Sequence, residues 1–266
     1  DVYKRQVNES VLNPMKYYQN NVLNLINFLE VIENTKINSF VFSSSCTVYG
    51  VPDKIPVKET APIKPAFSTY GYTKQVGERI LKDFFKSLPS SSLTLLRYFN
   101  PIGAHPSGLI GELPLGVPSN LIPYITQTAI GKRKKLTVFG KDYDTQDGTC
   151  IRDYIHVVDL ANAHVASLEK GLKSKGSIKT FNVGTGKGAS VLDVIAAFEK
   201  VSKQELNYGF GPRRAGDVPK IYSDNKLIKN ELDWDAKFSL EDSLEHSWNW
   251  EKNLIKFKYK SEKKQD

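Results

Sequence analysis

Predicted strands and helices alternate along the first hundred residues of this 266-residue chain. Pro14 opens a helical pattern that continues to about Asn34, with apolar residues at helical spacing. A strand is expected at 38–45, and a further strand is expected at 93–99. Between them a second helix carries Tyr70 and Lys74 and has an apolar stripe over 73–86. An alternation of this kind is typical of a parallel sheet covered by helices. The sequence therefore predicts an α/β fold.

Beyond this first part the pattern changes. Gly and Pro become frequent from Pro101 to Pro118, which indicates a loop. The elements after the loop are shorter and suggest a second, smaller α/β region interleaved with the first. We expect helices near 119–131, 157–170 and 190–202, and strands near 136–139 and 179–183.

Composition excludes several classes of protein. The content of hydrophobic residues, 40%, is sufficient for a folded core. The net charge of +8 arises largely from a Lys-rich tail at 253–266, which we interpret as solvated, so nucleic acid is not an expected partner. No apolar run is long enough to span a membrane. Cys46 and Cys150 form no disulfide framework and suit the cytoplasm, and the histidines are not spaced as metal ligands.

Three side chains suggest redox chemistry on an alcohol. Ser45 ends the strand at 38–45, and Tyr70 and Lys74 follow in a Tyr-x-x-x-Lys pattern. Residues four apart share one face of a helix, so the ammonium of Lys74 can favour the phenolate of Tyr70, whose ordinary pKa is about 10. Ligands of α/β folds bind at the carboxyl ends of strands, where Ser45 lies. We therefore expect these groups to remove a proton from an alcohol while a cofactor accepts the hydride.

With these residues in place, the chain resembles the extended short-chain dehydrogenase/reductase family, and within it the UDP-glucose 4-epimerases. The resemblance extends from about residue 7 to about residue 252 and rests on an ordered set of motifs. These are Phe42-Ser43-Ser44-Ser45-Cys46-Thr47-Val48-Tyr49-Gly50, Tyr70-Gly71-Tyr72-Thr73-Lys74, the stretch from Leu96 to Gly108, the stretch from Asp147 to Val157, and Arg213-Arg214-Ala215-Gly216-Asp217.

The resemblance implies an isomerase with a Rossmann-like parallel sheet that uses NAD. Tyr70 would be the catalytic base, Lys74 would hold the nicotinamide ribose, and Ser45 would bind the sugar 4-hydroxyl. UDP-galactose and UDP-glucose would interconvert through a 4-keto sugar that presents its other face before the hydride returns. The family also implies a homodimer formed through paired helices, for which the helix of Tyr70 is a candidate.

The resemblance also assigns residues to ligands. Besides the catalytic three, Asn20 and Phe99 would line the NAD site. The residues expected to bind the UDP-sugar are Asn100, Asn120, Leu121, Thr137, Val138, Phe139, Arg152, Arg214, Asp217 and Ile221. Arg152 and Arg214 would bind the diphosphate, and Asp217 the ribose hydroxyls. The intermediate size of Ile221 implies that N-acetylated sugars are poor substrates.

By the same resemblance, residues 7–118 are the remainder of an NAD-binding Rossmann domain. Residues 119–252 are mainly a UDP-sugar domain, some segments of which return to the Rossmann sheet. The glycine-rich turn with which the family begins is absent before Ser39, so we expect an amino-terminal truncation. The segment Gly184–Gly188 is glycine-rich but is expected to be an ordinary turn before a helix.

Two alternatives stay open at this point. A nucleotide-sugar 4,6-dehydratase shares the Tyr-Lys pair but needs an Asp-Glu pair after the strand-end hydroxyl, where this chain has Cys46 and Thr47. A catalytically impaired fragment that only binds nucleotide sugars would keep the UDP contacts without the glycine-rich turn.

Overall fold

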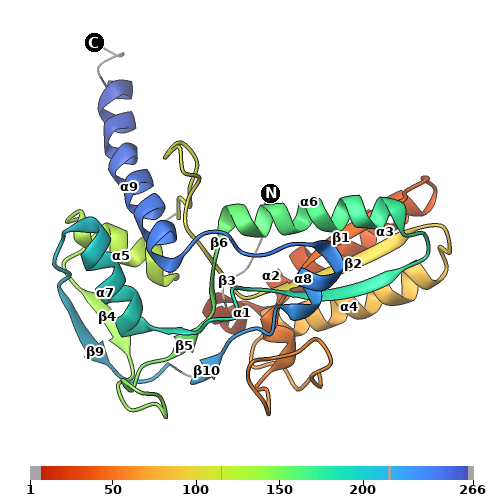
Figure 1. The fold of residues 1–266 in the computed structure, drawn as a ribbon, viewed down its shortest axis with the longest axis horizontal. Coiled ribbons are helices and arrows are strands. Elements are labelled where there is room, and N and C mark those ends of the chain that lie inside the picture. The colour runs from red at the N-terminus through yellow and green to blue at the C-terminus, as the bar shows by residue number, and fades with distance from the viewer. Residues whose placement is uncertain (1–6, 115, 215–216, 263–266) are drawn as a thin grey trace. The chain divides into compact units, whose positions relative to one another are not determined.

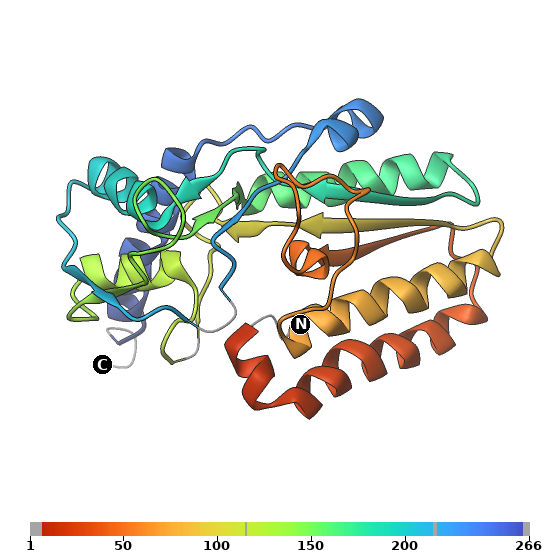
Figure 2. The same cartoon turned by 90° about the horizontal axis from the view of Figure 1, so that it is seen from below.

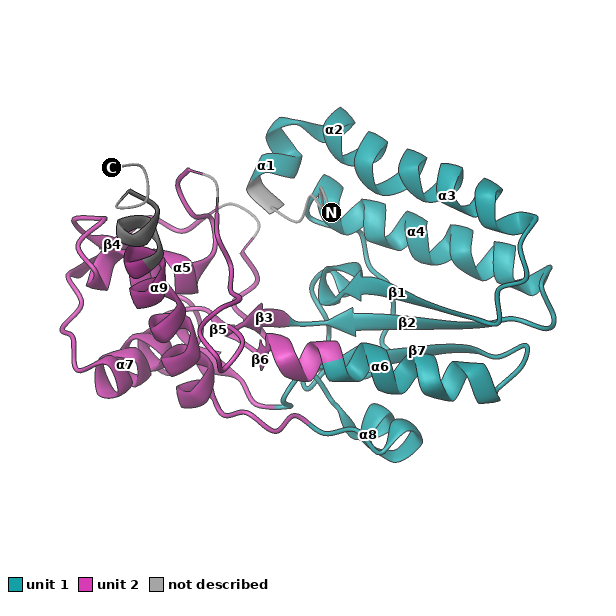
Figure 3. Ribbon diagram, turned by 90° about the horizontal axis from the view of Figure 1, so that it is seen from above, with its two compact units in different colours: residues 1–99, 162–186, 223–235 teal, residues 100–161, 187–222, 236–266 magenta. Residues whose placement is uncertain are grey.

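The structure is a computed structural model that describes residues 7–114, 116–214 and 217–262 (Figure 1). The chain forms two compact units, each assembled from three segments (Figure 3). Unit 1 consists of residues 1–99, 162–186 and 223–235, and unit 2 of residues 100–161, 187–222 and 236–266. Helix α6, Val157–Lys173, begins in unit 2 and continues in unit 1. The chain therefore leaves and re-enters each unit.

Unit 1 contains a parallel sheet of three strands in the order β1-β2-β7. The strands are β1, Ser39–Ser45, β2, Ser92–Tyr98, and β7, Ile178–Val183. Every residue of the central strand β2 is buried, as expected for a strand with a neighbour on each side and helices on both faces. The predicted parallel α/β sheet is confirmed.

Helices cover both faces of this sheet (Figures 2 and 3). Helices α3 and α4 lie on one face, and α6 and α8 lie on the other. Leu29 and Ile32 of α3 pack with Leu81 and Phe85 of α4 against the sheet. The helical elements of unit 1 besides α6 are α1 (Val7–Leu12), α2 (Pro14–Tyr18), the π-helical η1 (Gln19–Leu23), α3 (Asn24–Glu33), the 3₁₀ turn η2 (Cys46–Tyr49), α4 (Thr69–Lys86) and α8 (Lys226–Leu232).

One helix of unit 1 differs in detail from its prediction, and another agrees with it. The helix expected from Pro14 to Asn34 is interrupted by the π-helical η1. The predicted helix that carries Tyr70 and Lys74 is confirmed as α4. It begins at Thr69, where the Ser68 side chain accepts a hydrogen bond from the Gly71 backbone amide and caps the helix.

The described residues of unit 2 form three helices besides the start of α6, and their strands form small sheets. The helices are α5, Leu121–Ala129, α7, Val191–Ser202, and α9, Leu240–Glu262. The strands are β3 (Asn100–Ile102), β4 (Leu136–Phe139), β5 (Ile151–Arg152), β6 (Tyr154–His156), β8 (Ala189–Ser190), β9 (Tyr208–Gly211) and β10 (Lys220–Ile221). Strand β3 pairs with β6, β4 with β9, and β5 with both β10 and β8. Residues of α5, α7, α9 and β4 form the core, including Ile125, Phe198 and Leu244.

The carboxyl-terminal segment expected as a solvated tail is helical as far as Glu262, because it continues α9. Asn253 in this segment is partly buried. Among the described residues, no helix has the length and apolarity needed to cross a membrane.

Candidate functional site

Ser45, Tyr70 and Lys74 all lie in unit 1, on two neighbouring elements. Ser45 is the last residue of β1, and Tyr70 and Lys74 are one turn apart on α4. Their exposed fractions are 5%, 4% and 2%, respectively, so the three polar groups are buried. A buried hydroxyl, phenol and ammonium interact more strongly than they would in water.

The ammonium of Lys74 connects α4 to the end of β1. Its Nζ donates a hydrogen bond to the backbone oxygen of Ser43 at 2.8 Å, and lies 5.8 Å from the centre of the Tyr70 ring. Burial lowers the pKa of Lys74 to about 7, and the carboxylate of Glu78 opposes this shift. The protonation of Lys74 therefore changes near neutral pH, beside the phenol whose ionisation it can favour.

The hydroxyl of Ser45 has a fixed position. Its Oγ accepts a hydrogen bond from the backbone amide of Thr47 at 3.3 Å and from the Thr47 hydroxyl at 3.0 Å. Ser45 thereby caps the short η2 turn. Because Ser45 is the acceptor in both bonds, its own hydroxyl proton can be donated to another oxygen.

Tyr70 is supported by residues from the first helices, which sequence reasoning missed. The backbone amide of Tyr70 donates to Ser10 Oγ at 3.1 Å, and the ring of Tyr17 meets the Tyr70 ring edge-on at 6.5 Å. Asn21 Nδ2 donates to Thr73 Oγ1 at 3.1 Å. These contacts join residues about fifty to sixty positions apart, so local periodicity carries no sign of them.

The two further residues predicted to line a cofactor site also lie in unit 1. Asn20 lies in the π-helical η1, and its Nδ2 donates to the Lys16 backbone oxygen at 2.7 Å. Phe99 is buried directly after β2, and its backbone amide donates to Val183 of the neighbouring strand. π-Helical turns occur frequently at functional sites. The position of Asn20 is consistent with such a role.

A buried ionic network lies beside the catalytic candidates. Arg97 of β2 makes two hydrogen bonds to the carboxylate of Glu78, from Nε at 2.8 Å and from Nη2 at 2.6 Å. The Ser44 hydroxyl donates to the same carboxylate, and Arg97 Nη1 donates to the Tyr49 hydroxyl. Burial alone would raise the pKa of Glu78, but the bonds and charge of Arg97 hold it below its ordinary value. Glu78 is therefore an anion one helical turn from Lys74.

Four of the predicted substrate residues meet in unit 2. Arg214 donates to the Asp217 carboxylate at 3.1 Å and 3.3 Å, and Arg152 lies 3.7 Å from the same carboxylate. The Arg214 guanidinium also lies 5.1 Å from the centre of the Phe139 ring, which is partly exposed. One carboxylate thus pairs with two guanidinium groups, and the Arg214 group also lies against an aromatic ring, an arrangement suited to a phosphate and a base.

The remaining substrate candidates in unit 2 differ in exposure. Thr137 is exposed, but Val138 is 1% exposed and its side chain belongs to the core, so any ligand contact would come from its backbone. Ile221 is buried in β10, directly opposite Arg152. Asn100 begins β3, paired with Tyr154. Asn120 and Leu121 stand at the start of α5.

The segment Gly184–Gly188 follows β7. The backbone amide of Gly186 donates to the Ser223 hydroxyl at 3.2 Å, and the Gly184 carbonyl accepts from Asn225. Both partners lie about forty positions further along the chain, just before α8, so they join this segment to the start of that helix. The part of the chain that the structure describes holds no group of three or more His, Cys, Asp or Glu side chains arranged for a metal ion.

Comparison with known sequences identifies a matching family and related proteins. Residues 4–247 match the family profile described as GDP-mannose 4,6 dehydratase. The chain is 49% identical over 251 residues to a UDP-glucose 4-epimerase of Bacillus subtilis, an alignment that covers 94% of this chain and 74% of the relative.

Comparison with solved structures agrees with the sequence matches. The structure of UDP-glucose 4-epimerase from Bifidobacterium longum in complex with NAD⁺ and UDP has a TM-score of 0.91 and 43% identity, covering 95% of this chain and 75% of that one. The structure of UDP-glucose-4-epimerase from Stenotrophomonas maltophila with bound NAD and formylated UDP-arabinopyranose has a TM-score of 0.92 and 43% identity. The match covers 96% of this chain and 75% of that one. The Rossmann-like fold follows from this similarity.

Proposed function

Because the chain belongs to the UDP-glucose 4-epimerase family, we propose that it interconverts UDP-galactose and UDP-glucose by reversible oxidation at C4 of the sugar. The observation that carries the proposal is the buried group of Ser45, Tyr70 and Lys74, in which the Lys74 ammonium lies next to the Tyr70 ring at the end of β1. This group can remove and return the proton of one sugar hydroxyl.

Each of the three residues has a distinct role in this proposal. Tyr70 takes the proton from the sugar 4-hydroxyl and later returns it. Lys74 provides the positive charge that favours the Tyr70 phenolate. Ser45, whose Oγ already accepts from Thr47, donates a hydrogen bond to the sugar 4-oxygen and orients it.

The described residues of unit 1 fit the nicotinamide end of NAD. A dinucleotide binds at the carboxyl ends of parallel strands in folds of this type. Ser45 and Tyr98 end two neighbouring parallel strands in register, and Phe99 follows immediately. We propose that Lys74, Tyr70, Asn20, Phe99 and Ser45 hold the cofactor. When bound, NAD supplies reversible hydride acceptance at C4.

The UDP group is assigned to residues of unit 2. Arg152 and Arg214 would neutralise the diphosphate, and their shared partner Asp217 would accept from the ribose hydroxyls. Phe139 and the backbone of Thr137 and Val138 would contact the base. We assign Asn100, Asn120, Leu121 and Ile221 to the same nucleotide sugar.

The test is an assay of the full chain with added NAD and UDP-galactose, in which the formation of UDP-glucose is measured. Tyr70→Phe keeps the ring and removes the group that exchanges the proton, so the rate should fall by roughly a hundred-fold or more. Tyr72→Phe is the matched control, because Tyr72 is exposed on the same helix. Nucleotide-sugar binding by the chain without any turnover would contradict the enzymatic proposal and favour a binding role.

A homodimer is the proposed assembly. The end of η1 and helix α3 expose several apolar side chains, Leu23, Ile26, Phe28 and Val31, which a second copy would cover. Val31→Glu should shift the molar mass measured by light scattering toward the monomer. Val165→Glu, at an exposed apolar position on α6, should leave the mass unchanged. A monomer in the unsubstituted chain would contradict this assignment.

A further inference from the structure

The segment from Gly108 to Asn120, called the loop below, leads to the start of α5 in unit 2. It ends in a residue assigned above to the nucleotide sugar. All residues of the loop except 115 are described by the structure. The large apolar side chains Leu109, Ile110, Leu113 and Val117 are each more than 60% exposed. Burial of its own side chains therefore does not fix the loop.

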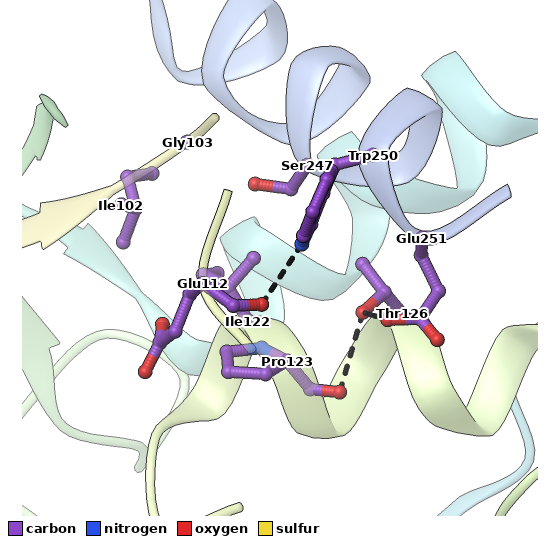
Figure 4. A pocket seen from close by; sticks show the side chains of 9 residues that line it. All are labelled: Ile102, Gly103, Glu112, Ile122, Pro123, Thr126, Ser247, Trp250 and Glu251. Carbon is purple, nitrogen blue, oxygen red and sulfur yellow. Dashed lines mark hydrogen bonds between the residues drawn. The ribbon is translucent and has the colours of Figure 1, made fainter. Parts of the chain in front are cut away.

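Two side chains of α9 bind the backbone of the loop. Trp250 Nε1 donates to the Glu112 carbonyl at 2.9 Å (Figure 4), and Asn253 Nδ2 donates to the Gly108 carbonyl at 2.9 Å. Thr126 and Pro123 of α5 line the small pocket that Trp250 and Glu112 also line (Figure 4). The loop is thus held at two points by one helix.

Glycines make this close approach possible. A Cβ at Gly111 would lie 2.4 Å from Cγ and Cδ1 of Trp250, so only a glycine lets the indole ring lie against the backbone here. A Cβ at Gly108 would lie 2.6 Å from Asn253 Nδ2, and Gly108 has a φ of +65°, which favours glycine. Loop and helix are therefore complementary in shape as well as in hydrogen bonding.

The contact continues from Glu112 to Asn120. Asn120 occupies the N-cap position of α5, but its side chain makes no cap bond. Its Nδ2 donates instead to Glu112 Oε1 at 2.8 Å. The residue whose carbonyl binds Trp250 therefore also orients the amide of Asn120 through its carboxylate.

Helix α9 is itself fixed to α5, which makes it a firm support. Glu251 is buried, forms an ion pair with Lys132, and accepts from the Thr126 hydroxyl at 3.3 Å. Trp248 packs edge-on against Phe198 of α7. Trp250 and Asn253 extend from this anchored part of the helix.

From these contacts we infer that Trp250 and Asn253 are positioning residues, which hold the loop so that Asn120 meets the nucleotide sugar in a single orientation. The inference rests on the proposed function, since it concerns the same ligand. Trp250 and Asn253 act through Glu112 and Asn120 and need no contact with the ligand themselves.

The test is the affinity of the full chain for UDP, measured by titration calorimetry. Trp250→Phe keeps an aromatic ring over Gly111 and removes the N–H donor, so UDP should bind roughly three- to ten-fold more weakly. Asn253→Ala should act in the same direction. Trp248→Phe is the matched control on the same helix, expected to lower the melting temperature and leave UDP affinity unchanged.

A double-mutant comparison separates positioning from a general structural role. In a chain that already carries Asn120→Ala, Trp250→Phe should change UDP affinity little, because its effect passes through Asn120. The same fold-change in both backgrounds would overturn the inference. Unchanged affinity in Trp250→Phe would also overturn it.

Arg214→Ala distinguishes this failure from failure of the proposed function. Weaker UDP binding by Arg214→Ala, with no effect of Trp250→Phe, overturns only the positioning role. Absence of UDP binding by the unsubstituted chain overturns the proposed function and the positioning role together.

Discussion

At the scale of single residues, Glu78 joins several side chains close to Lys74. Its buried carboxylate binds Arg97 twice and accepts from Ser44. Glu78→Gln would remove the negative charge and leave the Arg97 guanidinium buried without an anion. We expect the free energy of unfolding, measured in urea, to fall by about 3 kcal/mol.

The control for this prediction lies one and a half turns along the same helix. Asp83 pairs with Arg79 at an exposed position of α4. Asp83→Asn should leave stability unchanged within experimental error, because exposed ion pairs contribute little. Equal losses in the two variants would show that burial of the Glu78 pair is unimportant.

The residues around Glu78 show what a single sequence can and cannot predict. Tyr70 and Lys74 can be predicted from the sequence because they are four residues apart and their combined chemistry is specific. Glu78 and Arg97 are polar residues in segments whose apolar pattern predicts core, and their pairing depends on the fold of α4 onto β2. No local period encodes such a pairing.

At the scale of elements, β6 and α9 are joined by a pair of histidines. His156 Nδ1 accepts from the Val158 amide, so its proton is on Nε2, which lies 3.0 Å from His246 Nδ1. Burial, with nearby His246 and His105, lowers the pKa of His156 to about 4, and Asp242 opposes this shift. Protonation of His156 would place a hydrogen against the Val158 amide.

This pair predicts a dependence of stability on pH. The unfolded chain takes up a proton at His156 near pH 6.5 and the folded chain only near pH 4. The contribution of neutral His156 to the free energy of unfolding is therefore fully present above pH 6.5. It is lost as the pH falls toward 4, by up to about 3 kcal/mol. His156→Gln should flatten the unfolding free energy measured between these pH values. An unchanged slope in this variant would contradict the assignment.

The elements also differ in how well the sequence predicts them. Long elements with a clear period, such as α6, α7 and β2, lie close to their expected positions. Strands β5, β8 and β10 have two residues each, too few to show an alternation, and none of them was predicted. The π-helical η1 contacts α4, where Asn21 donates to Thr73, and the helical period of 14–34 reveals neither the turn nor this contact.

At the scale of the whole molecule, the candidate residues fall into two groups that belong to different units. The proton-transfer group of Ser45, Tyr70 and Lys74 is built on the parallel sheet of unit 1. The ionic group of Arg152, Arg214 and Asp217 is built on short strands and turns of unit 2. UDP binding and C4 chemistry are therefore assigned to different compact units, and a ligand that lacks the sugar should affect only one of them.

Hydrogen exchange measured by mass spectrometry tests this division. UDP alone should slow amide exchange in β4 and β5 of unit 2, because its base and phosphates are assigned to Phe139, Arg152 and Arg214. Exchange in α4 of unit 1 should stay the same, because UDP carries no hexose to reach Tyr70. Arg214→Ala should remove the protection in unit 2. Protection by UDP that is strongest in α4 would contradict the assignment of the nucleotide to unit 2.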